Sequence, residues 1–172
     1  VRAGAGREFI ISGTQTGQIA VTSGQHYARV TDYDIDANRV RSTGPVEASS
    51  ESLTHAAIYE LDPAINGVVH VHSKPLWQSL LGRLPTTGDD ISYGTPEMAL
   101  EFRRLYEQTD FAERGIAVMG GHEEGLAHEA FESAGPVHHR LIPRCVGLLA
   151  QHQLQSRIEA EGTDFVQRAL SK

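Results

Sequence analysis

The chain has 172 residues, 40% of them hydrophobic, which is enough apolar material for one compact domain with a buried core. Its formal net charge is −7 and it has no dense Lys/Arg run, which argues against nucleic acid as a partner. No apolar run approaches the ~20 residues needed to cross a membrane, and no signal peptide is visible. The only cysteine, Cys145, cannot form an intrachain disulfide. We therefore expect it to be a small buried apolar residue in a protein of the reducing cytoplasm.

The first part of the chain is predicted to form strands followed by one clear helix. Residues 8–12 have the pattern of a short buried strand, and a Gly/Thr-rich loop follows them. Two more strands, 26–36 and 39–43, are predicted to meet at a turn-forming Asp/Asn cluster. The helix is predicted within residues 48–63, and the Asp-Pro pair at 62–63 ends it.

The next part is predicted to return to a strand and then to a second long helix. Residues 67–73 form an apolar strand, and a short helix opens at Pro75. Residues 82–95 have the composition of a loop. The second long helix is expected to begin at Pro96, with Thr95 as its N-cap.

Helical spacing of apolar residues supports the second long helix, whose buried face would contain Met98, Phe102, Leu105 and Tyr106. A strand at 115–119 then leads into the polar turn 120–125. The remainder is predicted to be mainly helical, with a break at 135–136. Strands and helices are interleaved, so we predict a layered α/β fold, with residues 1–172 forming a single domain around one sheet.

The strand at 67–73 carries two histidines in an otherwise apolar run. Because side chains alternate along a strand, His70 and His72 share one face and Val69 and Val71 share the other. Two adjacent imidazoles need either ordinary hydrogen-bond partners or a metal ion. A structural zinc needs four protein ligands, usually including cysteines, whereas a catalytic zinc needs about three and an open position for substrate. A chain with one cysteine cannot supply the usual ligands of a structural zinc site.

The best candidate for a third ligand is His122, in the glycine-rich turn after the predicted strand 115–119. Taken alone, it could equally be a solvated loop histidine. Two motif-based alternatives fail: Leu126 breaks an H-E-x-x-H metalloprotease motif, and no G-K-[ST] follows the loop at 13–17 to make a P-loop. Five other histidines are expected to face water or to make local hydrogen bonds: His55, His128, His138, His139 and His152.

The start of the first helix has two readings. Ser49 or Ser50 suits an N-cap, and the Glu51 carboxylate suits the positive end of the helix dipole. Two serines and free backbone N–H groups at a helix start also suit an anion such as a phosphate.

From residue 8 to residue 125 the sequence resembles the class II aldolase/adducin-head family. The resemblance is strongest in S-S-E at 49–51, His55 and Tyr59 on the same helix, D-P at 62–63 and V-V-H-V-H-S at 68–73. Glu51 and His70 are separated by 70 − 51 = 19 positions, which is the spacing of the family's acid and first histidine ligand.

This resemblance implies a three-layer α/β/α domain with a central, mainly antiparallel sheet, normally assembled as a homotetramer. The family's G-N-x-S loop and first helices have no counterpart here, so the N-terminal part of the family domain is expected to be missing from the chain. His70, His72 and His122 would hold zinc or another divalent transition metal, and Glu51 would be the catalytic acid/base. The substrate phosphate would be bound by residues from two segments: Thr16 and Gly17, and Ser49 and Ser50.

The activity implied is that of a zinc-dependent aldolase-type lyase of carbohydrate metabolism. It would cleave a small sugar phosphate or related hydroxy-ketone by retro-aldol chemistry through a metal-stabilised enediolate. Glutamate at position 51 favours the fuculose-phosphate aldolase branch. The epimerase branch tends to carry Asp there, and the methylthioribulose-phosphate dehydratase branch lacks the S-S-E string. The alternatives are an epimerase or dehydratase of the same family, or an adducin-like assembly module without a metal.

Overall fold

The computed structural model describes residues 1–4 and 6–131, which belong to one compact unit. Its first sheet has the antiparallel order β1-β2-β3 and consists of β1 (Phe9–Ser12), β2 (Tyr27–Asp34) and β3 (Arg39–Thr43). The 3₁₀ helix η1 (Gly24–His26) leads directly into β2. The turn between β2 and β3 contains Asn38 at a φ of 49°, a conformation that asparagine tolerates well. The predicted turn at this point is confirmed.

The second sheet has the order β4-β6-β5 and is also antiparallel. In it, β6 (Gly125–Phe131) pairs with β4 (Ile65–His72) on one side and β5 (Ile116–Val118) on the other. The expectation of helix after the turn at 120–125 is therefore wrong for β6. The segment contains the good helix formers Leu126 and Ala127, but strand pairing on both sides outweighs a weak local propensity. Cys145 and the predicted break at 135–136 lie outside the described residues.

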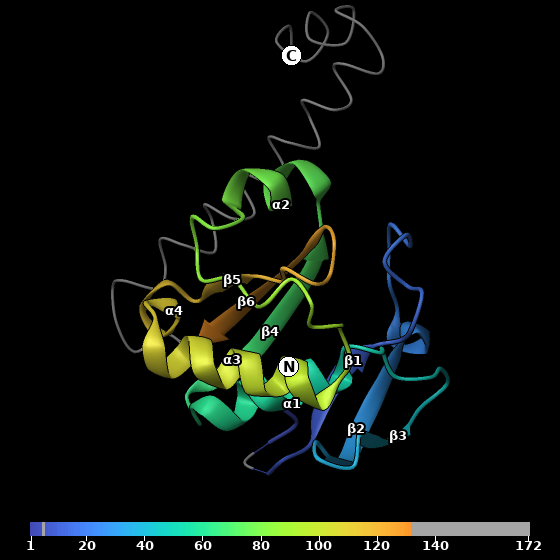
Figure 1. The fold of residues 1–172 in the computed structure, drawn as a ribbon. Helices are drawn as coiled ribbons and strands as arrows, with labels where there is room; N and C mark the ends of the chain where they lie inside the picture. The colour runs from blue at the N-terminus through green and yellow to red at the C-terminus, as the bar shows by residue number, and fades with distance from the viewer. Residues whose placement is uncertain (5, 132–172) are drawn as a thin grey trace, which may run out of the picture. The chain divides into compact units, whose positions relative to one another are not determined.

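Two long helices pack beside one another, and the first of them also packs against strands of both sheets. Figure 1 shows α1 (Ser52–Leu61) next to α3 (Pro96–Gln108), with α2 (Lys74–Leu80) following β4 and α4 (Phe111–Arg114) preceding β5. The α3 start is as predicted, because Thr95 Oγ1 accepts a hydrogen bond from the Met98 backbone N–H at 3.3 Å. The largest fully buried side chains of the core include Phe9, Ile58, Ile65, Met98, Phe102, Leu105 and Phe111.

The predicted mixed α/β class with antiparallel strands is confirmed, but the described strands form two sheets instead of one. Among the described strands no ladder joins β1, β2 or β3 to the second sheet, and α1 contacts strands of both. One backbone hydrogen bond, from Arg2 N–H to Asn66 O at 2.9 Å, links the N-terminal segment to β4. The three-layer arrangement and the single domain over 1–172 stay predictions.

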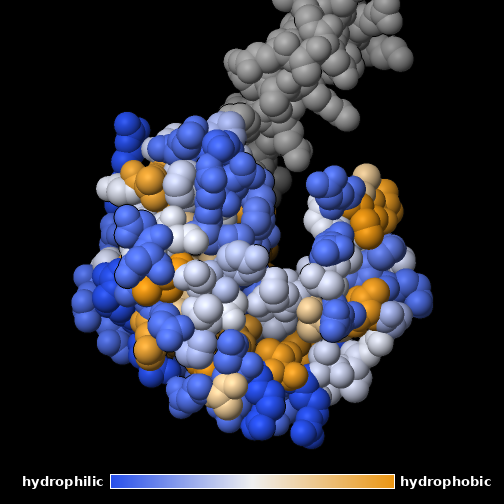
Figure 2. All heavy atoms as spheres, turned by 45° about the vertical axis from the view of Figure 1, so that its right-hand side comes forward, coloured by the Kyte–Doolittle hydropathy of each residue, from blue (hydrophilic) through white to orange (hydrophobic). Residues whose placement is uncertain are grey.

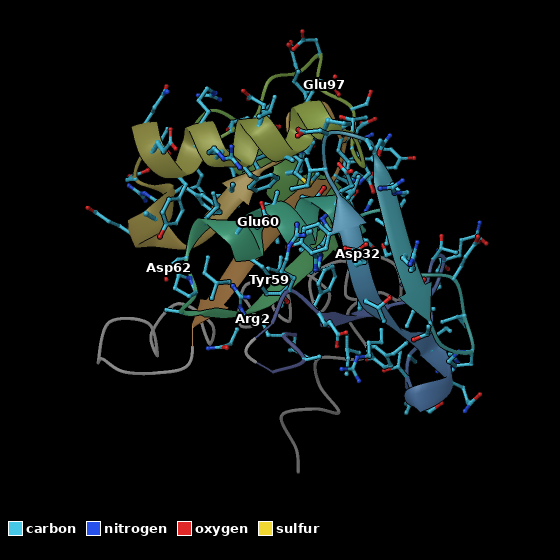
Figure 3. The ribbon with its side chains drawn as sticks, turned by 90° about the horizontal axis from the view of Figure 1, so that it is seen from below. Arg2, Asp32, Tyr59, Glu60, Asp62 and Glu97 are labelled. Carbon is cyan, nitrogen blue, oxygen red and sulfur yellow. The ribbon has the colours of Figure 1, made fainter. Side chains whose placement is uncertain are left out.

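Arg2 fixes the C-terminal end of α1. Its guanidinium donates to the backbone carbonyls of Tyr59, Asp62 and Ile65 and lies 5.0 Å from the centre of the Tyr59 ring. Figure 3 shows Arg2, Tyr59 and Asp62 together at this end of the helix. The last carbonyls of a helix have no intrahelical partner, so Arg2 satisfies groups that would otherwise be left without a hydrogen bond.

The face seen in Figure 2 is mainly hydrophilic, with apolar side chains in small separate groups, and it is hollowed beside a lobe at the right. None of the helices in residues 1–4 and 6–131 is long and apolar enough to cross a membrane.

Candidate functional site

Pairing of β4 with β6 brings the two parts of the candidate site together. His72 pairs with Gly125 and His70 with Ala127, so the turn before β6 lies at the end of β4 (Figure 1). This turn contains His122 and is closed by its own backbone hydrogen bonds, from Gly125 N–H to His122 O and from His122 N–H to Met119 O. The fold thus places a residue 50 positions further along the chain next to the His70–His72 pair.

The three imidazoles converge through their ring nitrogens. Nε2 of His72 lies 2.9 Å from Nε2 of His70 and 3.2 Å from Nε2 of His122. One ligand atom of each residue lies within 4.8 Å of the others. The ring of His70 stacks on that of His122, while His72 meets both edge-on. This arrangement satisfies the geometric requirement for three ligands of one ion.

The protonation of His70 and His122 suits them to act as ligands. Burial, with a further contribution from neighbouring histidines, lowers the pKa of each to about 4. Both rings are therefore neutral at pH 7. Nδ1 of His70 lies 3.1 Å from the Leu126 carbonyl oxygen, and an Nδ1–H donating to that oxygen leaves the Nε2 lone pair facing the cluster.

Glu51 is the buried acid of this site. The helix begins at Ser52, so Glu51 takes the N-cap position, and its side chain makes no capping hydrogen bond. The residue is 5% exposed, both carboxylate oxygens lack a hydrogen-bond partner, and Oε1 lies 3.8 Å from Nε2 of His122. Because His122 is neutral at pH 7, this contact is not an ion pair.

Burial raises the pKa of the Glu51 carboxyl, and Thr54 opposes part of that rise. The Thr54 hydroxyl nevertheless makes no hydrogen bond of ordinary geometry with the carboxylate, so the lone pairs of Glu51 stay unused. A buried carboxylate without a partner is costly, and it suggests that a cation belongs beside it.

These side chains fit a divalent transition metal. Three imidazole nitrogens and a carboxylate without a partner form a ligand set that zinc commonly uses. Two tetrahedral ligands of zinc stand about 3.3 Å apart when each bond is about 2.0–2.1 Å. The two Nε2 separations at His72, 2.9 and 3.2 Å, differ from this by only a few tenths of an ångström, and all three ligand atoms lie within 4.8 Å of one another.

Two glycines before His122 permit a close approach of the loop between α2 and α3. A Cβ on Gly120 would lie 2.4 Å from the Thr87 carbonyl oxygen, and one on Gly121 would lie 2.1 Å from that of Ile91. Thr87 also holds the turn, because its hydroxyl accepts from Gly120 N–H at 3.0 Å. The double glycine is therefore a packing requirement that sets the position of His122.

We expect Gly121→Ala to lower the free energy of unfolding by about 1–3 kcal/mol, because the Ile91 backbone must move to admit the methyl group. Metal binding should weaken as well, since His122 is the next residue. Chemical denaturation of the purified variant measures the first effect. Gly24→Ala is the matched control, because nothing lies within 4 Å of its added Cβ. Equal stability of the two variants would contradict the packing argument.

The predicted caps are wrong, and the predicted phosphate residues lie in two neighbouring segments. Ser49 and Ser50 do not cap α1; instead, the Ser49 hydroxyl accepts from Glu51 N–H at 3.2 Å in a local turn. The segment 12–14 runs beside 47–49, through hydrogen bonds such as Ser49 N–H to Ser12 O. The loop containing Thr16 and Gly17 begins there, and the Thr16 hydroxyl donates to Gly13 O at 2.7 Å.

Three further polar residues near the site differ in their surroundings. Glu123 is exposed and forms an ion pair with Lys74 at 2.6 Å. Glu124 adopts a positive φ of 75° in the turn. His55 is 7% exposed, so the first of its two expected alternatives, facing water, is wrong; burial, with a contribution from His70, lowers its pKa to about 3. It lies on α1, and its backbone N–H donates to the Glu51 carbonyl.

Tyr93 at the rim of the site was not predicted from the sequence. Its ring centre lies 4.3 Å from that of His122, although it comes from the loop between α2 and α3. The double glycine signalled a close approach of some segment, but it could not indicate which one, since the loop has no periodic pattern.

A separate cavity of about 490 Å³ contains none of these histidines. Its lining includes Asp32, Tyr33, Glu60 and Arg103, and Glu60 lies near the far end of α1 from Glu51 (Figure 3). Nine residues at 1.5 Å each make that distance along the helix about 13 Å. The cavity therefore does not belong to the histidine cluster.

The chain also matches a known family over the segment that carries the site. The family model of the class II aldolase and adducin N-terminal domain matches residues 7–122. A methylthioribulose-1-phosphate dehydratase of Hahella chejuensis (strain KCTC 2396) is 32% identical over 92 residues, covering 51% of this chain and 43% of that protein. The chain thus spans less than half the length of this curated relative. Glu51 and the three histidines fall within the matched segment, and the chain belongs to the class II aldolase and adducin family.

Proposed function

We propose that the chain is a metal-dependent lyase that cleaves a small sugar phosphate or related hydroxy-ketone by retro-aldol chemistry. The observation that carries the proposal is the buried Glu51 carboxylate, which has no hydrogen-bond partner and lies 3.8 Å from one of three converging histidines. An acid of this kind beside three converging imidazoles suits proton transfer next to a bound cation.

His70, His72 and His122 would hold the ion, with zinc as the first choice for three imidazole ligands. A divalent ion there would polarise a substrate carbonyl and stabilise the negative charge that develops on its oxygen. The hydrogen bond from His70 to Leu126 O keeps that ring in the required orientation.

Glu51 would move the proton. In the retro-aldol direction it takes the proton from the hydroxyl on the carbon that becomes the aldehyde. The neighbouring carbon–carbon bond then breaks, and its electron pair passes to the ketone fragment. The same carboxyl can return the proton to that fragment, so that atoms and charge balance.

We further propose that Ser49, Ser50, Thr16 and Gly17 bind a substrate phosphate. The support is the lateral contact of segments 12–14 and 47–49: the loop with Thr16 and Gly17 follows the first segment, and Ser49 and Ser50 shortly precede α1. Hydroxyls and backbone N–H groups at a helix N-terminus favour an anion.

Dehydration of a sugar phosphate is the second candidate, because the curated relative is named as a dehydratase. In that reaction Glu51 would take the proton from the carbon beside the carbonyl and return it to the hydroxyl on the next carbon, which would leave as water. The same side chains could serve either reaction, since both create negative charge on the carbonyl oxygen.

Product analysis separates these reactions. The zinc-loaded protein is incubated with a panel of keto-sugar phosphates that includes methylthioribulose 1-phosphate, and the products are measured by mass spectrometry. Retro-aldol cleavage gives two fragments, whereas dehydration gives one product lighter by one water. A protein that holds about one ion per chain and converts none of the panel would contradict the proposed activity. A metal-free protein would instead favour an adducin-like assembly role.

We expect the protein to form a homotetramer with its sites near subunit boundaries. The support is family membership and the openness of the site, where His72 is exposed and Tyr93 is 48% exposed. A neighbouring subunit would then supply the missing wall. Light scattering should give about four times the chain mass of 18.7 kDa. A monomer mass at micromolar concentration would count against this prediction.

A further inference from the structure

The three histidines of the cluster are not held in the same way. Nδ1 of His70 lies 3.1 Å from the carbonyl oxygen of Leu126, which fixes that ring. Among the residues that the structure describes, no hydrogen bond is made by Nδ1 of His122. A histidine ligand usually donates its second N–H to a carbonyl or carboxylate, and this partner sets the ring orientation. The orientation of His122 must therefore be fixed by something else.

Ring packing takes the place of that hydrogen bond. The centre of the Tyr93 ring lies 4.3 Å from that of His122, and the two planes are inclined by 43°. The backbone of Gly125 also closes in, since a Cβ built on it would lie 2.4 Å from Cδ2 of His122. Rotation of the His122 side chain would collide with these neighbours.

Tyr93 is itself held firmly although it is 48% exposed. The residue after it, Gly94, adopts a φ of +67°, and a Cβ there would lie 2.9 Å from the Ser50 carbonyl oxygen. On its other side, Thr95 Oγ1 donates to Ser92 O at 2.8 Å while accepting from the first turn of α3. The loop thus packs closely against Ser50 on one side of Tyr93 and is hydrogen-bonded through Thr95 to the start of α3 on the other.

We propose that Tyr93 is a positioning residue for His122: its ring holds the imidazole with Nε2 directed at the other two histidines. This inference rests on the proposed metal-binding function. It assigns the effect to the aromatic ring and not to the hydroxyl, so phenylalanine should replace tyrosine fully and alanine should not.

The test is titration of the metal-free protein with Co²⁺, followed by the visible absorption of the bound ion. Tyr93→Ala should bind Co²⁺ about tenfold more weakly than the wild type and show an altered absorption spectrum, as outer-shell substitutions commonly do. Tyr93→Phe should match the wild type in both respects. Tyr27→Ala is the matched control, because Tyr27 is 37% exposed and lies on β2, outside the cluster.

Two results would overturn the inference: wild-type affinity and spectrum in Tyr93→Ala, or an equal loss in Tyr93→Phe, which would assign the effect to the hydroxyl. Leucine has no aromatic ring to stack on His122, so Tyr93→Leu should lose Co²⁺ affinity as Tyr93→Ala does. It replaces the alanine variant in the test if Tyr93→Ala does not fold. Failure of the proposed function looks different. In that case the wild type itself binds no Co²⁺, or His122→Ala binds it as well as the wild type. Either result would show that the three histidines are not a metal site, and Tyr93 would then have no ligand to position.

Discussion

Glu51→Gln is expected to keep the fold and most of the metal while turnover falls by about 10²–10⁴-fold. The amide cannot accept and return the substrate proton, yet it has almost the same shape. The carboxylate is 5% exposed and its oxygens have no hydrogen-bond partner, so loss of its charge should not destabilise the metal-free protein. Three measurements on one preparation are needed: turnover, metal per chain and melting temperature.

Glu60→Gln is the control on the same helix, since Glu60 is exposed and pairs with Arg7 at the surface. It should leave turnover unchanged. If Glu51 only stabilises the start of the helix and has no catalytic role, Glu51→Gln should show a different pattern. Its free energy of unfolding should fall by about 0.3–1 kcal/mol while its activity stays complete. Wild-type turnover would therefore show that the base lies elsewhere. Glu123 and Glu124 would be the next candidates, although Glu123 is already paired with Lys74.

His72→Ala is expected to reduce bound metal from about one ion per chain to nearly none, and turnover should fall to background. The reason is that Nε2 of His72 lies close to both other ligand nitrogens, 2.9 Å from that of His70 and 3.2 Å from that of His122. The side chain is exposed, so its removal should leave the metal-free protein folded. Elemental analysis and circular dichroism measure these two properties.

His26→Ala is the matched control, because His26 lies in η1, outside the histidine cluster, and its Nδ1 accepts a hydrogen bond from the Ser23 backbone N–H. Its metal content should equal that of the wild type. If His72→Ala retains a full ion, the three histidines are not its ligands and the proposed centre is wrong.

The sequence predicted the local elements well wherever periodicity and end signals agreed. Thr95 and Pro96 marked the start of α3, and the apolar spacing from Met98 to Leu105 identified its buried face. The strand β6 was missed because its Leu and Ala residues favour helix locally, whereas its pairing partners lie far away in the chain. The start of α1 was misplaced by a few residues because Ser49 bonds within a turn that precedes the helix.

The candidate site could be predicted in its residue types but not in its surroundings. Alternation along β4 placed His70 and His72 on one face, and the glycine turn indicated His122 as a third ligand. The contribution of Tyr93 could not be predicted, because a loop without periodicity gives no sign of what it packs against. The burial of Glu51 was equally hidden, since a carboxylate at a helix start is normally solvated.

The most direct test of the metal centre is anomalous X-ray diffraction from crystals of the zinc-loaded protein, recorded at the zinc absorption edge. We predict one strong peak per chain, about 2.0–2.1 Å from a ring nitrogen of each of His70, His72 and His122. A zinc peak at other residues, with the three histidines left without an ion, would contradict the account.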